Sequence, residues 1–213
     1  MKIGIIGATG MAGSNIYKEA VKRDHEVTAI VRDSEKAKEL LGEHVQVITS
    51  DALDLSREDL EGFDVVVNAF GTAPDTAYLH VDLAAQLVKH FRKNEETRLF
   101  FILGAGSLFD QKEERFIETI RQTPGSENFI QIPEAQLKEL NFLEGVENVD
   151  WVGVSPGAEF VVGEVSEYRL GQDHLLFDED GKSETTYATM AQVILDEIEN
   201  PTHTQERFTA INI

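Results

Sequence analysis

Cysteine is absent from this chain of 213 residues, and cationic side chains are scarce. The absence of thiols excludes disulfide bonds, thiolate metal sites and cysteine nucleophiles. With 39 acidic side chains against 19 lysines and arginines, the formal net charge is -20, which opposes nonspecific contact with nucleic acids and anionic membranes. A phosphate-bearing ligand would therefore depend on local backbone amides and a few well-placed arginines.

Long apolar runs and paired histidines are also missing. No stretch approaches the roughly 18 apolar residues of a membrane span, and the apolar N-terminal stretch is too short and too glycine-rich for a signal peptide. None of the six histidines lies three or four residues from another, so no metal site is predicted. We expect a single cytoplasmic domain over residues 1–213 with no nucleic-acid or membrane partner, and the oligomeric state stays open.

The first thirteen residues, MKIGIIGATGMAG, carry the most informative pattern. Ile3, Ile5 and Ile6 form a short β-branched run that is typical of a buried central strand. A glycine-rich turn follows from Gly7 to Gly13, and apolar residues then recur at helical spacing. The pattern therefore predicts a strand, a tight turn and a helix.

The glycine spacing suits a phosphate-binding turn. Gly7 permits the tight exit from the strand, Gly10 lets a pyrophosphate approach the backbone, and Gly13 lets the helix lie close to the sheet. The first helical turn offers unpaired N–H groups and the positive end of its dipole to a phosphate. A tight turn without a ligand is the alternative, but the position between a strand and a helix favours nucleotide binding.

Arg32 and Asp33 follow the second predicted strand, Glu26–Val31, where a dinucleotide-binding unit contacts the adenosine ribose. An arginine there suits the 2′-phosphate of NADP, whereas a carboxylate suits the 2′-hydroxyl of NAD. Asp33 either turns toward the ribose or caps the helix predicted at 35–41. Because Arg32 comes first, NADP is the preferred cofactor and NAD is the alternative.

Four further predicted strands end in small or polar residues that would meet at one edge of a parallel sheet. They span 45–48, 64–68, 99–103 and 151–154, and they precede Asp51 and Ala52, then Ala69, Phe70 and Gly71, then Gly104-Ala105-Gly106-Ser107, then Ser155 and Pro156. Asp51 is either a partner of the adenine amino group or a loop carboxylate. Ser107 is either a substrate-facing hydroxyl or a loop cap.

The order of the predicted elements indicates the fold class. Strands alternate with helices predicted at 35–41, 78–93, 112–121, 133–143 and 187–198, and a last strand is predicted at 207–213. This alternation is typical of an α/β, doubly wound parallel sheet of the Rossmann type, with the ligand crevice at the carboxyl ends of the strands. Residues 158–185 have a short, irregular pattern and are expected to form a small segment that covers the substrate.

Several of these motifs together resemble the atypical short-chain dehydrogenases/reductases. They are Gly7-Ala8-Thr9-Gly10 with Gly13, Arg32, Gly104-Ala105-Gly106-Ser107, Ser155-Pro156, and the tail DEIENP with Arg207-Phe208-Thr209. Within that group the chain is similar to the NAD(P)H-binding proteins that include NADH-flavin reductase-like, NmrA-like and biliverdin reductase B-like members. The resemblance covers nearly the whole chain and implies a Rossmann domain with a small C-terminal cap.

The resemblance also implies a set of cofactor-binding residues for NADP or NAD. These are Gly7, Thr9, Gly10, Met11, Arg32, Asp51, Ala52, Ala69, Phe70 and Gly71. Ser107 matches the family's crevice serine near the nicotinamide and is the candidate catalytic residue. Pro156 is expected to form one wall beside it.

The residue pair of ordinary short-chain reductases is missing. Those enzymes use a tyrosine whose pKa is lowered by a lysine four residues later, but Tyr17, Tyr78, Tyr168 and Tyr187 are followed at that spacing by Val21, Asp82, Gln172 and Ala191. No Gly-X-Ser-X-Gly nucleophile elbow is present either. Two hypotheses remain: an NAD(P)H-dependent reductase of a flat small-molecule acceptor such as FMN or FAD, or a non-catalytic, redox-sensing regulator of the NmrA-like kind.

Overall fold

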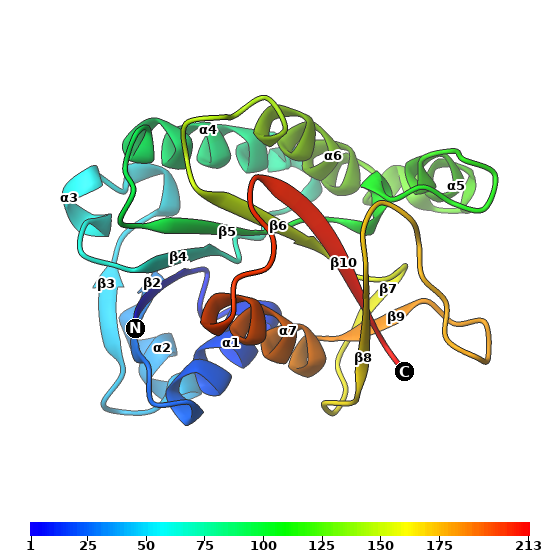
Figure 1. Cartoon of the computed structure of the whole chain (residues 1–213). Helices are drawn as coiled ribbons and strands as arrows, with labels where there is room; N and C mark the ends of the chain where they lie inside the picture. Colours follow the sequence, from blue (N-terminus) through cyan, green and yellow to red (C-terminus); the bar gives the residue numbers. More distant parts are fainter.

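A computed structural model describes residues 1–213 and shows a central sheet of eight strands (Figure 1). The strand order is β3-β2-β1-β4-β5-β6-β10-β8, and every neighbouring pair is parallel except β10 and β8. The strands are β1 (Lys2–Ile6), β2 (Glu26–Val31), β3 (Gln46–Thr49), β4 (Val65–Asn68), β5 (Arg98–Ile102), β6 (Trp151–Ser155), β8 (Tyr168–Gly171) and β10 (Glu206–Asn212). This topology confirms the predicted Rossmann-type α/β fold.

Helices cover both faces of the sheet, because its strands are apolar on both sides. One face packs against α1 (Met11–Lys22), α2 (Ser34–Leu41) and α7 (Tyr187–Glu199), and the other packs against α4 (Leu79–Phe91) and α6 (Gln131–Leu143) (Figure 1). Alternate residues of one strand serve the two cores: Ile5 belongs to the first and Ile6 to the second, and both are at most 1% exposed. No helix is long and apolar enough to cross a membrane.

The chain reverses its direction of travel across the sheet between β3 and β4. Strands β1, β2 and β3 proceed one way, and β4 then returns to the other side of β1. The chain after β1 enters α1 on one face of the sheet, and the chain after β4 leads to α4 on the other face. A crevice is therefore left between these two loops at the carboxyl ends of the paired strands, which is where ligands of open α/β sheets bind.

Two glycines of the first turn allow β1, β4 and α1 to approach one another. Gly7 has a φ of 78°, and a Cβ on it would lie 2.6 Å from the carbonyl oxygen of Ala69. A Cβ on Gly13 would lie 2.9 Å from the Cα of Ala8. Both positions therefore require glycine for steric reasons.

Residues 158–185 are more regular than their sequence indicated. They contain β7 (Glu159–Val161), β8 and the start of β9 (Glu184–Thr186); β7 and β9 pair as a separate two-stranded parallel sheet, and β8 extends the main sheet as its antiparallel edge. Strands of three or four residues are too short for alternation to stand out in the sequence. The segment therefore contributes to the main sheet as well as to the site.

The prediction of a helix over 112–121 was wrong at its beginning, since α5 spans only Phe116–Gln122. The carboxylate of Asp110 accepts hydrogen bonds from the backbone N–H groups of Lys112 and Glu114, at 2.7 and 3.1 Å. This side chain holds residues 110–114 in a turn, which competes with a helix. The short helix α3 (Arg57–Leu60), capped by Ser56, was not predicted because a single turn has no periodicity.

Candidate nucleotide-binding site

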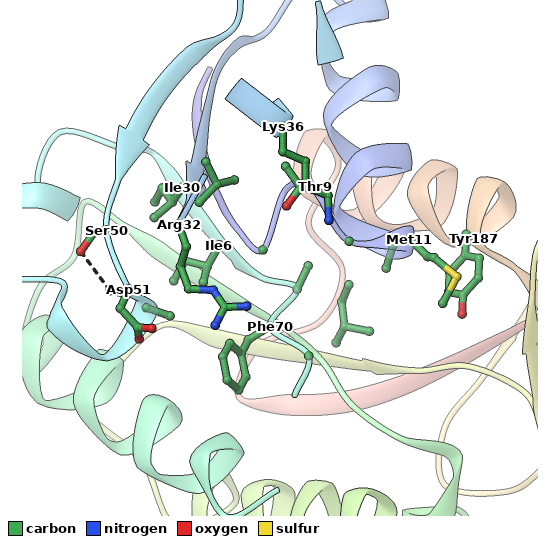
Figure 2. A pocket seen from close by; sticks show the side chains of 18 of the residues that line it. Ile6, Thr9, Met11, Ile30, Arg32, Lys36, Ser50, Asp51, Phe70 and Tyr187 are labelled. Atoms are coloured by element: carbon green, nitrogen blue, oxygen red, sulfur yellow. Dashed lines mark hydrogen bonds between the residues drawn. The ribbon is translucent and has the colours of Figure 1, made fainter. Parts of the chain in front are cut away.

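A cavity of about 440 Å³ lies at the carboxyl ends of the central strands (Figure 2). Most of its lining comes from the ends of β1, β2, β3 and β4 with their following loops and from the starts of α1, α2 and α7, and single residues of β5, α6 and β7 complete it. The lining residues are Ile6, Gly7, Thr9, Gly10, Met11, Ala12, Ile30, Val31, Arg32, Lys36, Ser50, Asp51, Ala52, Ala69, Phe70, Gly71, Ile102, Gln136, Phe160 and Tyr187. The structure thus brings together ten of the twelve predicted site residues, all except Ser107 and Pro156.

The start of α1 forms a cradle suited to a phosphate group. Gly10 precedes the helix in an extended conformation, and no side chain caps the first turn. The backbone N–H groups of Met11 and Ala12 are therefore left for a ligand, and both residues line the cavity. A Cβ at Gly10 would have a single close neighbour, the carbonyl oxygen of Gly7 at 3.2 Å, which is a tight contact; the rest of the space in front of α1 is open to a ligand.

The end of the cavity beside β2 carries two cations. Figure 2 shows the guanidinium of Arg32 directed into the cavity, and Lys36 extends toward the same space from the first turn of α2. The carboxylate of Asp33 accepts a hydrogen bond from the backbone N–H of Lys36 at 3.0 Å and caps α2. Of the two interpretations of Asp33, the structure therefore shows the helix cap.

Asp51 lies on the same side, at the end of β3. One carboxylate oxygen accepts a hydrogen bond from the backbone N–H of Leu53 at 3.0 Å, which caps a 3₁₀ turn over Ala52–Asp54. Ser50 donates its hydroxyl to the backbone carbonyl of Asp51 at 2.9 Å. The loop is thus held by its own side chains, while the second carboxylate oxygen of Asp51 has no partner within the protein.

A buried polar cluster supports the tip of β4. The side-chain oxygen of Asn68 accepts the backbone N–H of Phe70 at 3.2 Å, and its amide donates to Glu139 at 3.4 Å. His80 lies 3.6 Å from the second oxygen of Glu139, and both side chains are at most 3% exposed. Burial raises the pKa of Glu139. Asn68 therefore fixes the loop that presents Phe70 to the cavity.

The opposite end of the cavity is aromatic. Phe160 of β7 and Tyr187, the first residue of α7, lie with ring centroids 4.2 Å apart and planes inclined by 51°. Both rings line the cavity, and Figure 2 shows Tyr187 beside Met11, at the end away from Ser50 and Asp51. Burial raises the pKa of Tyr187 above its usual value of 10.0.

Several lining residues were not predicted from the sequence. The polar and aromatic ones are Lys36, Ser50, Gln136, Phe160 and Tyr187. Lys36 had a local signal, because it follows Arg32 by four residues at the start of a predicted helix. Phe160 and Tyr187 had none that would have paired them, since long-range packing brings them together.

Ser107 and Pro156 lie outside the lining. The hydroxyl of Ser107 donates to the backbone carbonyl of Gly104 at 3.0 Å, and the side chain is 1% exposed. Ser155 donates to the same carbonyl at 3.1 Å, and Pro156 is buried beside it. In this arrangement Ser107 holds the loop after β5, and its catalytic role stays a prediction.

The chain is similar in sequence to known proteins over most of its length. The sequence model of a family described as NAD(P)H-binding matches residues 7–201. The chain is 39% identical to protein YwnB of Bacillus subtilis strain 168 over 216 residues, covering 100% of this chain and 99% of YwnB.

Two solved structures are similar over the whole fold. A protein of Lactobacillus casei is 39% identical, with a TM-score of 0.92 over 100% of this chain and 99% of the other. A proposed NADH-flavin reductase of Streptococcus pneumoniae TIGR4 is 35% identical, with a TM-score of 0.89 over 100% of both chains.

Proposed function

The chain belongs to the NAD(P)H-binding family, and on that premise we propose that it is an NAD(P)H-dependent oxidoreductase that reduces a flavin or a similar flat conjugated acceptor. The observation that carries this proposal is the arrangement of the cavity, which runs from the cations Arg32 and Lys36, past the open amides of α1, to the ring pair Phe160 and Tyr187. Polar recognition at one end and an aromatic surface at the other suit a dinucleotide that presents its nicotinamide to a second flat ring.

The cation pair supports NADP as the preferred cofactor. Arg32 provides the planar, bidentate donor that suits a phosphate, and Lys36 adds a second positive charge nearby. The carboxylate that would favour the 2′-hydroxyl of NAD, that of Asp33, is engaged as the cap of α2. The chain as a whole has a net charge of -20, so binding of an anionic cofactor depends on local positive charges such as these two.

The chemistry proposed for the site needs no acid of lowered pKa. A reduced nicotinamide bound here would supply a hydride, that is two electrons and one proton, and water would supply the second proton that the reduced acceptor takes up. The chain's residues hold and align the two rings, and such alignment contributes up to about 7 to 11 kcal/mol in favourable cases. Tyr187 is the only tyrosine that lines the cavity, and burial raises the pKa of its hydroxyl. Ala191 occupies the position, four residues later, where ordinary short-chain reductases have the lysine that lowers the tyrosine pKa.

This environment distinguishes between classes of acceptor. A flavin or quinone spreads the incoming negative charge over a conjugated system, whereas a simple ketone depends on a proton donor in the transition state. We therefore expect FMN, riboflavin or a quinone to be reduced, and aldehydes and simple ketones to react poorly.

Steady-state consumption of NADPH with FMN, riboflavin or menadione tests the proposal. Gly10→Leu is the variant designed to block the cofactor, because its side chain fills the space before α1 while φ at this position, -78°, is open to any residue. We expect turnover by the wild type and loss of both cofactor binding and turnover in a folded Gly10→Leu variant. Tight NADPH binding without turnover of any acceptor would contradict the reductase and favour the redox-sensing regulator.

A further inference from the structure

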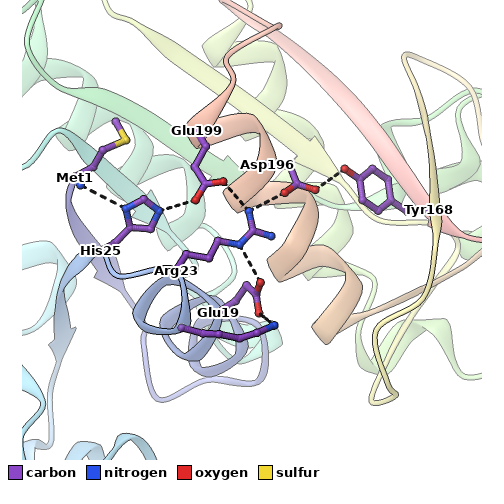
Figure 3. A network of polar contacts seen from close by, with 8 residues as sticks. Met1, Glu19, Arg23, His25, Tyr168, Asp196 and Glu199 are labelled. Atoms are coloured by element: carbon purple, nitrogen blue, oxygen red, sulfur yellow. Dashed lines mark hydrogen bonds and ion pairs between the residues drawn. The ribbon is translucent and has the colours of Figure 1, made fainter.

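The hydroxyl of Tyr187 has no hydrogen-bond partner within the protein, although its ring is partly buried in the cavity wall. Tyr168 offers a contrast, since its hydroxyl donates to Asp196 at 2.6 Å (Figure 3). The Tyr187 hydroxyl is not among the buried polar atoms that lack a partner, so it is open to the cavity and to the water there. A ligand that carries an acceptor atom can therefore replace water as the partner of this hydroxyl.

The position of the Tyr187 ring is fixed by its neighbours. Thr186 caps α7 by accepting the backbone N–H of Thr189 at 3.1 Å, and its own N–H donates to Asn212 at 3.1 Å. The preceding strand β9 pairs with β7, which places Phe160 against the Tyr187 ring. These contacts hold the hydroxyl at the aromatic end of the cavity.

Resting on the reductase function proposed above, we infer that Tyr187 donates a hydrogen bond to a carbonyl oxygen of the flat acceptor. Flavins and quinones carry such oxygens in conjugation with the atom that is reduced, and the oxygen becomes a stronger acceptor as negative charge reaches it. The raised pKa of Tyr187 keeps the proton on its hydroxyl at neutral pH, so that the group acts as a donor and not as a base. Phe160 supplies the neighbouring apolar surface.

Tyr187→Phe tests this inference, because it keeps the ring against Phe160 and removes only the hydroxyl. Two probes with carbonyl oxygens, FMN and menadione, are compared with methylene blue, a flat dye that has none. In the NADP⁺-loaded protein we expect FMN and menadione to bind about three- to tenfold more weakly, the effect of one neutral hydrogen bond. Affinities for NADPH and for methylene blue should stay within about twofold of wild type.

Tyr168→Phe is the matched control, since it removes a tyrosine hydroxyl that points to Asp196 and does not line the cavity. Unchanged FMN and menadione binding in Tyr187→Phe, or an equal loss for methylene blue, would overturn the inference. Failure of the wild type to oxidise NADPH would refute the reductase function alone, because the binding comparison still decides the role of Tyr187. If the wild type binds neither FMN nor menadione, both proposals fall.

Discussion

Removing the charge of Arg32 should reduce the affinity for NADPH selectively. Charge-assisted hydrogen bonds to a phosphate contribute about 1.5 to 3 kcal/mol, which corresponds to about 10- to 150-fold in affinity. Arg32 and Lys36 are both exposed, and solvent screening places each contribution at the lower end of that range. We expect Arg32→Ala to weaken NADPH binding about tenfold and to change NADH binding by less than about twofold.

The structure offers a matched control on the same helix. Lys38 of α2 forms an ion pair with Glu35 at 2.7 Å and does not line the cavity. Lys38→Ala removes the same net charge as Lys36→Ala, so it separates contact with the cofactor from the general electrostatic effect. Lys36→Ala should weaken NADPH binding, whereas Lys38→Ala should leave both cofactors nearly unaffected.

Fluorescence or calorimetric titration with NADPH and NADH, at 0.05 and 0.5 M salt, provides the measurement. In the wild type, the difference in affinity between NADPH and NADH should shrink at high salt, because salt screens the attraction of Arg32 and Lys36 for the 2′-phosphate. The Arg32→Ala, Lys36→Ala double variant should bind the two cofactors almost equally. An equal loss of NADPH and NADH affinity in Arg32→Ala would refute the reasoning and indicate that Arg32 does not contact the 2′-phosphate.

Two further predictions concern stability. Burial opposes the ionisation of Glu197, but hydrogen bonds from Thr202 and His203 outweigh it and lower the pKa of Glu197 from 4.5 to about 2. The ionised Glu197 therefore stabilises the folded state fully above pH 4.5, and this contribution is lost as the pH falls toward 2. Urea unfolding across this range should show Glu197→Gln less stable by about 1 to 3 kcal/mol at pH 7 and equal to wild type near pH 2, and a difference independent of pH would contradict this. Arg23, at the end of α1, pairs with Glu19 of the same helix and joins it to α7 through Asp196 and Glu199, at 2.7 to 2.9 Å (Figure 3). Arg23→Met should therefore lower the free energy of unfolding by about 1 to 3 kcal/mol without altering NADPH titration; unchanged stability would show that the network contributes nothing.

The sequence alone determined the elements that depend on local pattern. The run Ile3 to Ile6, the glycine turn and the following helix are specified by residues next to one another, since strand alternation, positive φ at Gly7 and helical spacing act over a few residues. Parallel order followed from the alternation of strands and helices. Arg32 could be placed at the cavity because every such strand ends at the same edge of the sheet.

Tertiary structure alone decided the features that depend on contacts between distant segments. Asp33 was compatible with two roles, and only its position against the N–H of Lys36 selected the cap. Phe160 and Tyr187 meet because β7 pairs with β9, a register that no local pattern specifies. Ser107 follows a glycine-rich strand end, as the predicted cofactor-binding residues do, yet its hydroxyl donates to the carbonyl of Gly104 outside the cavity lining. The burial of a side chain depends on which segments pack over it, and its neighbours in the sequence do not specify them.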